Sequence, residues 1–200
     1  FNGVHLKGTG GGPGIPGISF QDGGNIEKLV FKSCVLSDTN TFLKVVNGKS
    51  AMELTFENCH IHTIGQFVLW TATAAITKTT LVGNYVDATN CGGVTNAAAA
   101  LFRVRSGSLE VYNNYFKGDS ANTPGYFEAL NDSVVKFNVF DTVSRFVHPT
   151  ALNKLVFDHN VYLNASGKAL DASPVTGGGS ITVDATVAKT AEEAKELYEQ

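Results

Sequence analysis

The chain has 200 residues, of which only 16% are charged, and its formal net charge is −3. This charge argues against nucleic-acid binding, which usually needs a basic stripe, and no apolar run approaches the roughly 18 residues of a membrane-spanning helix. A continuous array of repeats favours a single domain over residues 1–200.

The first expected element is a partial coil at the start of the chain, with apolar residues Val4 and Leu6. A glycine-rich loop over residues 8–17 should connect this partial coil to a strand that contains Ile18 and Phe20. The loop lacks the Lys-Ser/Thr ending and the following helix of a phosphate-binding loop, so we do not expect it to bind phosphate.

The central part of the chain repeats one short pattern. Aligned on one anchor residue per copy, the anchors are Cys34, Cys59, Asn84, Asn114, Asn138 and Asn160, with spacings of 25, 25, 30, 24 and 22 residues. Apolar residues recur three positions before the anchor (Phe31, Phe56, Leu81, Val111, Val135, Phe157) and two after it (Leu36, Ile61, Val86, Phe116, Phe140, Tyr162). Alternation with period two predicts strands with one buried face. A drifting repeat of this length predicts a solenoid, and the L-x-x-L-x-L spacing of a leucine-rich repeat is absent.

The alternation breaks at the residue just before each anchor. These residues are Ser33, Asn58, Gly83, Asn113, Phe137 and His159. Asn, Gly and His tolerate positive φ better than most residues, so we predict a tight corner that joins two strands and turns the anchor inward. The anchor Asn amides should then stack and hydrogen-bond from coil to coil. Cys34 and Cys59 should be buried thiols, because parallel stacking holds their Cβ atoms too far apart for a relaxed disulfide.

These features resemble the right-handed parallel β-helix proteins of the pectate-lyase-like superfamily, over about residues 26–170. The resemblance implies an all-β fold, a right-handed single-stranded parallel β-helix of about six to seven coils. It also implies a secreted, periplasmic or cell-surface location. The chain begins at Phe1 rather than Met, which is typical of an excised fragment. The superfamily includes lyases, hydrolases, adhesins and phage fibres, so the fold leaves the function open.

The C-terminal extension, residues 171–200, should contain a short α-helix over 190–199. Thr190 and Glu193 have the spacing of a capping box, and Leu197 lies on an apolar stripe of the helix. Open ends of a β-helix expose unpaired strand edges, so we expect this helix to act as a cap.

After each anchor strand, a connection of unequal length leads to a further strand. The expected strands cover residues 42–46, 67–71, 101–105, 126–130 and 145–148. Variable loops on a regular scaffold usually carry binding and catalysis, so the outer face of these strands is the expected floor of a site. The candidate catalytic residues are Lys44, Arg103 and Arg105, and the candidate substrate-binding residues are Glu128, Arg145 and His148. Lys44, Arg103 and Glu128 should fall near one column.

Residues 102–107 are loosely similar to the arginine-bearing coil of alginate- and chondroitin-lyase families, which implies that Arg103 or Arg105 contacts a substrate carboxylate. Those families place acidic metal ligands about one coil earlier, where this chain has no carboxylate. The alternative, which we favour, is that Arg103 and Glu128 form a cross-strand ion pair on a solvated face.

Calcium is the only cofactor for which the sequence offers candidates. These are the loop-start aspartates Asp38, Asp87, Asp119 and Asp141, of which Asp87 and Asp119 are the preferred ligands. Aspartates at such positions more often form turns, and no dense cluster of oxygen ligands appears. His60 and His62 are expected to alternate across a strand, with one of them pointing inward, which would leave neither with a metal-ligand partner.

Two functional classes compete. We favour a non-catalytic extracellular or surface module that binds a uronate-type polysaccharide as a monomer, because the acidic cluster is missing. The alternative is a polysaccharide lyase that cleaves an acidic polysaccharide by β-elimination. A structural adhesin or fibre segment is a third possibility, but it should show a smooth apolar stripe along the rod, and the outward positions show none.

Overall fold

The computed structural model describes residues 1–8, 16–20, 26–45, 52–70, 76–87, 89, 102–104, 107–118, 127–129, 133–141, 154–163 and 180–183. The strands are β1 (His5–Lys7), β2 (Pro16–Phe20), β3 (Lys28–Lys32), β4 (Val35–Val45), β5 (Met52–Glu57), β6 (His60–Trp70), β7 (Ile76–Val82), β8 (Tyr85–Asp87), β9 (Phe102–Val104), β10 (Ser108–Tyr112), β11 (Tyr115–Lys117), β12 (Phe127–Ala129), β13 (Ser133–Lys136), β14 (Val139–Asp141), β15 (Lys154–Asp158), β16 (Val161–Leu163) and β17 (Ser180–Val183). Within these ranges there is no helix, so the described part of the chain is all-β as predicted.

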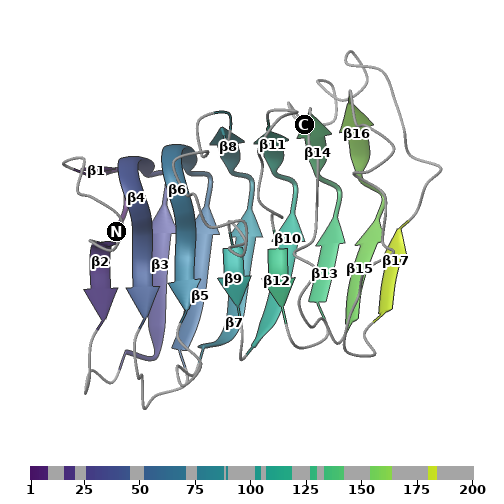
Figure 1. Cartoon of the computed structure of the whole chain (residues 1–200), viewed down its shortest axis with the longest axis horizontal. Coiled ribbons are helices and arrows are strands. Elements are labelled where there is room, and N and C mark those ends of the chain that lie inside the picture. Colours follow the sequence, from purple (N-terminus) through teal and green to yellow (C-terminus); the bar gives the residue numbers. More distant parts are fainter. Residues whose placement is uncertain are drawn as a thin grey trace.

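The strands form two sheets in which every pairing is parallel (Figure 1). The 7-stranded sheet has the order β17-β15-β13-β10-β7-β5-β3. The 10-stranded sheet has the order β1-β4-β6-β8-β11-β14-β16, with β2 beside β4, β9 beside β6 and β12 beside β9. Each repeat gives one strand to the first sheet and the next strand to the second. Neighbouring strands in a sheet therefore come from successive repeats, as the periodicity predicts.

The predicted corner is present in every repeat. The residues before the anchors have positive φ throughout: Ser33 (52°), Asn58 (53°), Gly83 (65°), Asn113 (55°), Phe137 (57°) and His159 (52°). Gly3 has the same conformation, with φ of 64°, and Phe1 stacks on Phe31 with ring centroids 5.1 Å apart. The pattern therefore already operates at the first residues, where the sequence analysis recognised only a partial coil.

The core lies between the two sheets and consists of columns of like side chains. Phe31 and Phe56 stack with centroids 5.0 Å apart, and Phe116 and Phe140 stack at the same separation further along. All four rings are fully buried. Because equivalent positions of successive repeats lie side by side in a parallel sheet, one apolar residue per repeat is enough to build each column.

The anchors behave as predicted. Asn84, Asn114, Asn138 and Asn160 are fully buried and hydrogen-bonded to one another. Cys34 and Cys59 are buried free thiols, and burial raises the pKa of Cys59 to about 11.

Some elements differ from the expectation. The anchor strand and the further strand are continuous in β4 and β6, which have 11 residues each. The links after these two anchors are short, so β4 and β6 stay paired along their whole length. Within β4, Asp38 has a positive φ of 56°. The strand β17 extends the 7-stranded sheet beyond residue 170. The predicted helix over 190–199 and the predicted strand over 145–148 lie outside the described residues.

Candidate functional site

The strand register places part of the predicted lyase site. Arg103 and Glu128 are direct partners on β9 and β12, as the ion-pair alternative requires. Lys44 pairs with Leu69, and Phe102 pairs with Val68, so Arg103 continues the row of Lys44 and Leu69. The backbone therefore brings Lys44, Arg103 and Glu128 into one row across the 10-stranded sheet. Their side chains, and all of Arg105, Asp119, Arg145 and His148, lie outside what the structure describes, so their roles stay predictions.

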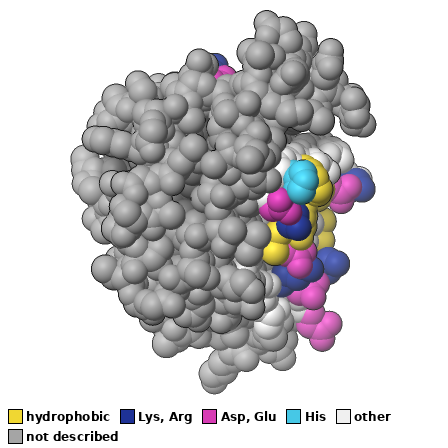
Figure 2. Space-filling model, turned by 90° about the vertical axis from the view of Figure 1, so that its right-hand side faces the viewer, with side chains coloured by type: hydrophobic (Ala, Val, Ile, Leu, Met, Phe, Trp, Pro, Cys, Tyr) yellow, Lys and Arg dark blue, Asp and Glu magenta, His cyan; other side chains and the backbone are white. Residues whose placement is uncertain are grey.

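The outer face of the 7-stranded sheet carries paired charges. The ion pairs are Lys32–Glu57 at 2.7 Å, Lys78–Glu110 at 2.8 Å, Lys136–Asp158 at 2.9 Å and Lys28–Glu53 at 3.9 Å. Figure 2 shows basic and acidic side chains next to one another on the coloured part of the surface. The hydrogen bond to Glu110 raises the pKa of Lys78. Exposed pairs of this kind contribute little to stability, but they leave these charges engaged with each other, so this face is a poor candidate for ligand binding.

The outer face of the other sheet has a different character. Two rows of polar and aromatic side chains follow the anchors there, and we call them together the His–Tyr face: His60, Tyr85 and Tyr115 in the first row, and His62, Asp87, Lys117 and Asp141 in the second. In β6, β8 and β11, the first and third positions after the anchor point away from the core, because the anchor itself and the second position after it are buried. In β14 only the third position, Asp141, continues the face, because Val139 is buried. The face therefore spans β6, β8, β11 and β14.

The prediction that one of His60 and His62 points inward is wrong. Residues two apart in a strand share a face, and the two imidazole rings lie 4.9 Å apart on the outside of β6. His60 is exposed and His62 is partly buried. The structure therefore brings two histidines together on one surface.

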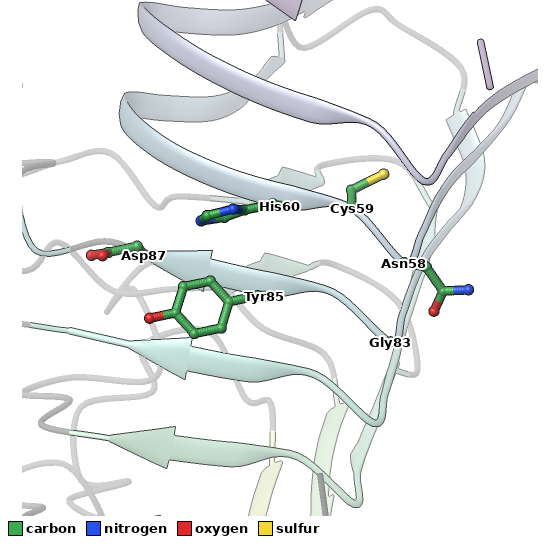
Figure 3. Close-up of a pocket in the computed structure, with 6 residues that line it drawn as sticks. All are labelled: Asn58, Cys59, His60, Gly83, Tyr85 and Asp87. Carbon is green, nitrogen blue, oxygen red and sulfur yellow. The ribbon is translucent and has the colours of Figure 1, made fainter. Parts of the chain in front are cut away.

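An open pocket of about 550 Å³ lies at the start of these strands. It is lined by Asn58, Cys59, His60, Gly83, Tyr85 and Asp87. The side chains of His60, Tyr85 and Asp87 extend to one side of the sheet, and Asn58 at the corner points away from them (Figure 3). A Cβ atom on Gly83 would lie 2.2 Å from Oδ1 of Asn58, so only glycine fits this corner without displacing Asn58.

The side chains of the His–Tyr face contact one another across the strands. His60 meets Tyr85 edge-to-face with centroids 5.0 Å apart, and Tyr85 stacks on Tyr115 at 5.4 Å. The Tyr115 hydroxyl donates a 2.7 Å hydrogen bond to Oδ2 of Asp141. Because the tyrosine rings stack on each other, they present their edges and hydroxyls outward rather than their faces.

The titratable groups at the pocket have shifted pKa values. Burial and the nearby His62 lower the pKa of His60, although Asp87 opposes this. Burial alone would raise the pKa of Asp87, but hydrogen bonds from Thr89 and the charge of Lys117 bring it below its ordinary value. Burial and Asp87 raise the pKa of Tyr85. At neutral pH the pocket therefore holds a neutral imidazole, an ionised carboxylate and a protonated phenol.

The candidate calcium ligands are only partly covered by the described residues, because Asp119 lies outside them. In the described ranges, no group of three or more His, Cys, Asp or Glu side chains could hold a metal ion. Asp87 accepts hydrogen bonds from the Thr89 hydroxyl at 2.6 Å and from its N–H at 3.0 Å, which is the turn-forming role that aspartate commonly takes. Asp38 accepts a hydrogen bond from Ser37 and pairs with Lys7 at 3.6 Å.

A serine and a histidine also meet near the start of the chain. Nε2 of His5 lies 2.9 Å from Oγ of Ser37, and Ser37 donates to Oδ2 of Asp38 at 3.1 Å. In a catalytic triad the carboxylate orients the histidine, whereas here it bonds to the serine. Ser37 is also fully buried, so this cluster is not arranged for nucleophilic attack.

No protein-family model matches the chain, and neither a curated protein nor a solved structure matches it significantly. Within the described residues, no helix is long and apolar enough to cross a membrane.

Sequence reasoning missed the His–Tyr face because it searched the strands that follow the variable loops. A signal was present in the repeat itself. The position after the anchor is occupied by His60, Tyr85 and Tyr115 in three consecutive repeats. Polar aromatic residues at an outward position need a reason other than core packing.

Proposed function

We propose that the chain is a right-handed parallel β-helix of the pectate-lyase-like superfamily that binds a uronate-type polysaccharide without cleaving it, as a secreted or surface-located monomer. Strands that alternate between two parallel sheets, a positive-φ corner in every repeat and an inward asparagine ladder support the fold. The same proposal includes the C-terminal helical cap.

The observation that carries the binding function is the His–Tyr face. It presents imidazole, phenol, carboxylate and ammonium groups in two rows on successive strands of one sheet. Tyrosine and histidine combine an apolar ring with a polar tip, which suits sugars, because sugars have apolar C–H edges and many hydroxyls. Rows that repeat with each turn of the chain suit a ligand that is itself a repeating polymer.

The stacking geometry narrows the mode of binding. Tyr85 and Tyr115 lie nearly parallel, with 12° between their planes, so their faces are directed along the row. A sugar chain on this surface would meet ring edges and hydroxyls, and its recognition would depend on hydrogen bonds more than on stacking. Lys117 is exposed and supplies the cation in the centre of the second row for a uronate carboxylate.

Calorimetric titration with oligogalacturonate and oligoalginate tests the proposal. We expect Tyr85→Phe and Lys117→Gln each to weaken binding several-fold, because each removes one hydrogen bond or charge contact worth about 1 kcal/mol. Tyr112→Phe is the matched control, because Tyr112 lies on the outer face of the 7-stranded sheet and should not affect binding. Absence of binding to every glycan, or equal affinity in all variants, would contradict the proposal.

A polysaccharide lyase is the second candidate, favoured by the row that contains Lys44, Arg103 and Glu128. A base that removes the proton beside a uronate carboxylate and a cation that stabilises the resulting charge are the two requirements. The absorbance of the unsaturated product, followed with and without Ca²⁺, would reveal this activity. If the protein shows this activity and Arg103→Ala abolishes it, the lyase function replaces the binding function.

A further inference from the structure

We propose that His60 and His62 form a second carboxylate-binding site for the polysaccharide, in addition to Lys117, and that they hold a uronate carboxylate as a pair of imidazolium ions. This inference rests on the proposed function, and it adds the group that is recognised and the condition under which the site operates. It predicts acid-dependent binding of a carboxylate-bearing glycan.

The geometry of the two histidines suits a single carboxylate. Both side chains project from the same face of β6, with ring centroids 4.9 Å apart and 49° between the ring planes. His60 is exposed and borders the pocket of 550 Å³. A protonated imidazole has two N–H donors and no acceptor, so the pair offers charged donors to both oxygens of a carboxylate. Charged hydrogen bonds of this kind are about twice as strong as neutral ones.

The charges around the pair decide when an anion can bind. On the side of β8, β11 and β14, the titratable groups are Tyr85, Asp87, Tyr115, Lys117 and Asp141. On the side of β4 and β1, Asp38 and Lys7 form an ion pair, and His5 contacts Ser37. With neutral histidines, the His–Tyr face therefore has two carboxylates against one ammonium, and this net negative charge weakens the binding of an anionic glycan. Protonation of His60 and His62 reverses the sign of this local charge.

In the free protein, protonation of His60 is opposed. Burial and His62 lower the pKa of His60, so His60 takes up its proton at a lower pH than an ordinary histidine does. A carboxylate between the rings would offset this repulsion, so binding should take up protons. By linkage, affinity must then rise as the pH falls. The stability of the free protein depends on pH in the opposite direction. Because the pKa of His60 is lower in the folded than in the unfolded protein, His60 contributes stability above its unfolded pKa, and this contribution is lost as the pH falls and His60 becomes protonated.

The test is calorimetry with oligogalacturonate at about pH 5 and about pH 8, on either side of the ordinary histidine pKa. Uronate carboxyls stay ionised at both values, since model carboxyls titrate near pH 4. We expect binding at least ten-fold tighter at the lower pH, with proton uptake detected as a dependence of the binding enthalpy on the buffer. A neutral oligosaccharide should show no such pH dependence.

Two variants locate the effect. His60→Gln and His62→Gln should each reduce the ten-fold difference to less than three-fold, whereas His159→Gln should retain it, because His159 is an exposed corner residue outside the His–Tyr face. Asp87→Asn is an independent check that does not alter either histidine. It removes a carboxylate that favours protonation of His60 and repels anions, so affinity at about pH 8 should rise and the midpoint for His60 protonation should fall.

The outcomes separate the two proposals. Equal affinity for oligogalacturonate at both pH values, or full pH dependence in the His60→Gln and His62→Gln variants, would overturn the histidine site and leave the glycan-binding function intact. Absence of binding to acidic and neutral glycans at both pH values would overturn the binding function and the histidine site together.

Discussion

Oδ1 of Asn114 accepts two hydrogen bonds from Asn84, one from its backbone N–H at 2.8 Å and one from its Nδ2 at 2.9 Å. The same two bonds recur between Asn114 and Asn138 and between Asn138 and Asn160. The Nδ2 of Asn114 also donates to the Leu81 carbonyl at 3.0 Å. Each carboxamide thus satisfies buried backbone groups of the preceding repeat. The ladder therefore links successive repeats where their corners leave backbone groups without sheet partners.

The ladder makes Asn114 a sensitive polar position. Asn114→Ala should lower the free energy of unfolding by about 3–5 kcal/mol, because the N–H of Asn84 and the carbonyl of Leu81 would be buried without partners. Urea denaturation followed by circular dichroism measures this loss. Asn113→Gly is the control: Asn113 is exposed with φ of 55°, and glycine adopts that conformation freely. Equal destabilisation by both substitutions would show that the ladder contributes no more than the corner.

The thiol end of the ladder should accept an asparagine. The Cys59 N–H donates to Oδ1 of Asn84 at 2.8 Å, and its Sγ lies 3.4 Å from the Phe31 carbonyl, which is the equivalent of the Phe56 carbonyl that Nδ2 of Asn84 reaches. Cys59→Asn should therefore leave stability unchanged or raise it by up to about 1 kcal/mol, since a thiol is a weak donor and an amide a good one. Cys59→Leu should destabilise the protein. A loss above about 2 kcal/mol in Cys59→Asn would show that the space at this end is too small for another rung.

One core hydroxyl should be dispensable. Thr79 is fully buried, and in the described residues its Oγ1 has no hydrogen-bond partner. The equivalent Ser133 instead accepts a 2.9 Å hydrogen bond from the Leu109 N–H. Thr79→Val keeps the shape and removes an unsatisfied polar group, so it should raise the free energy of unfolding by about 1–2 kcal/mol. Thr80→Val, on the outer face of the same strand, should have little effect. Destabilisation by Thr79→Val would show that the hydroxyl has a partner in solution.

The corners and the ladder were predictable because each favours a small set of residue types at one position of the repeat. A positive φ selects Asn, Gly and His, and an inward amide must find amide partners, so spacing and composition together identify both. Phe137 adopts the corner conformation against its own preference, with φ of 57°. There the neighbouring repeats determine the backbone and the residue type does not.

The candidate site was less predictable from the sequence. In β4 and β6, the strand after the anchor continues into the next strand without a break. This continuity depends on the backbone path of the short link between them, which residue types alone do not predict. Arg103 and Glu128 are register partners, but the proximity of His60 and Tyr85 depends on pairing between outward positions of different repeats. The alignment of the repeats gives the strand register. Predicting this contact requires the register to be used for the outward positions as well as for the inward ones.

The Phe137 corner offers a test of how much strain the repeat tolerates. Phe137 is 54% exposed, and its ring lies next to that of His159, with ring centroids 5.6 Å apart. A left-handed conformation costs an ordinary residue about 1–2 kcal/mol. The cost is lower for asparagine, because its side chain hydrogen-bonds to the nearby backbone. Phe137→Asn should therefore raise the free energy of unfolding by about 0.5–1 kcal/mol after loss of the exposed ring contact. Asn113→Phe, at the equivalent corner with φ of 55°, should lower it by a similar amount. Chemical denaturation of both variants measures the pair of changes. A lower stability of Phe137→Asn would mean that the contact with His159 outweighs the backbone cost.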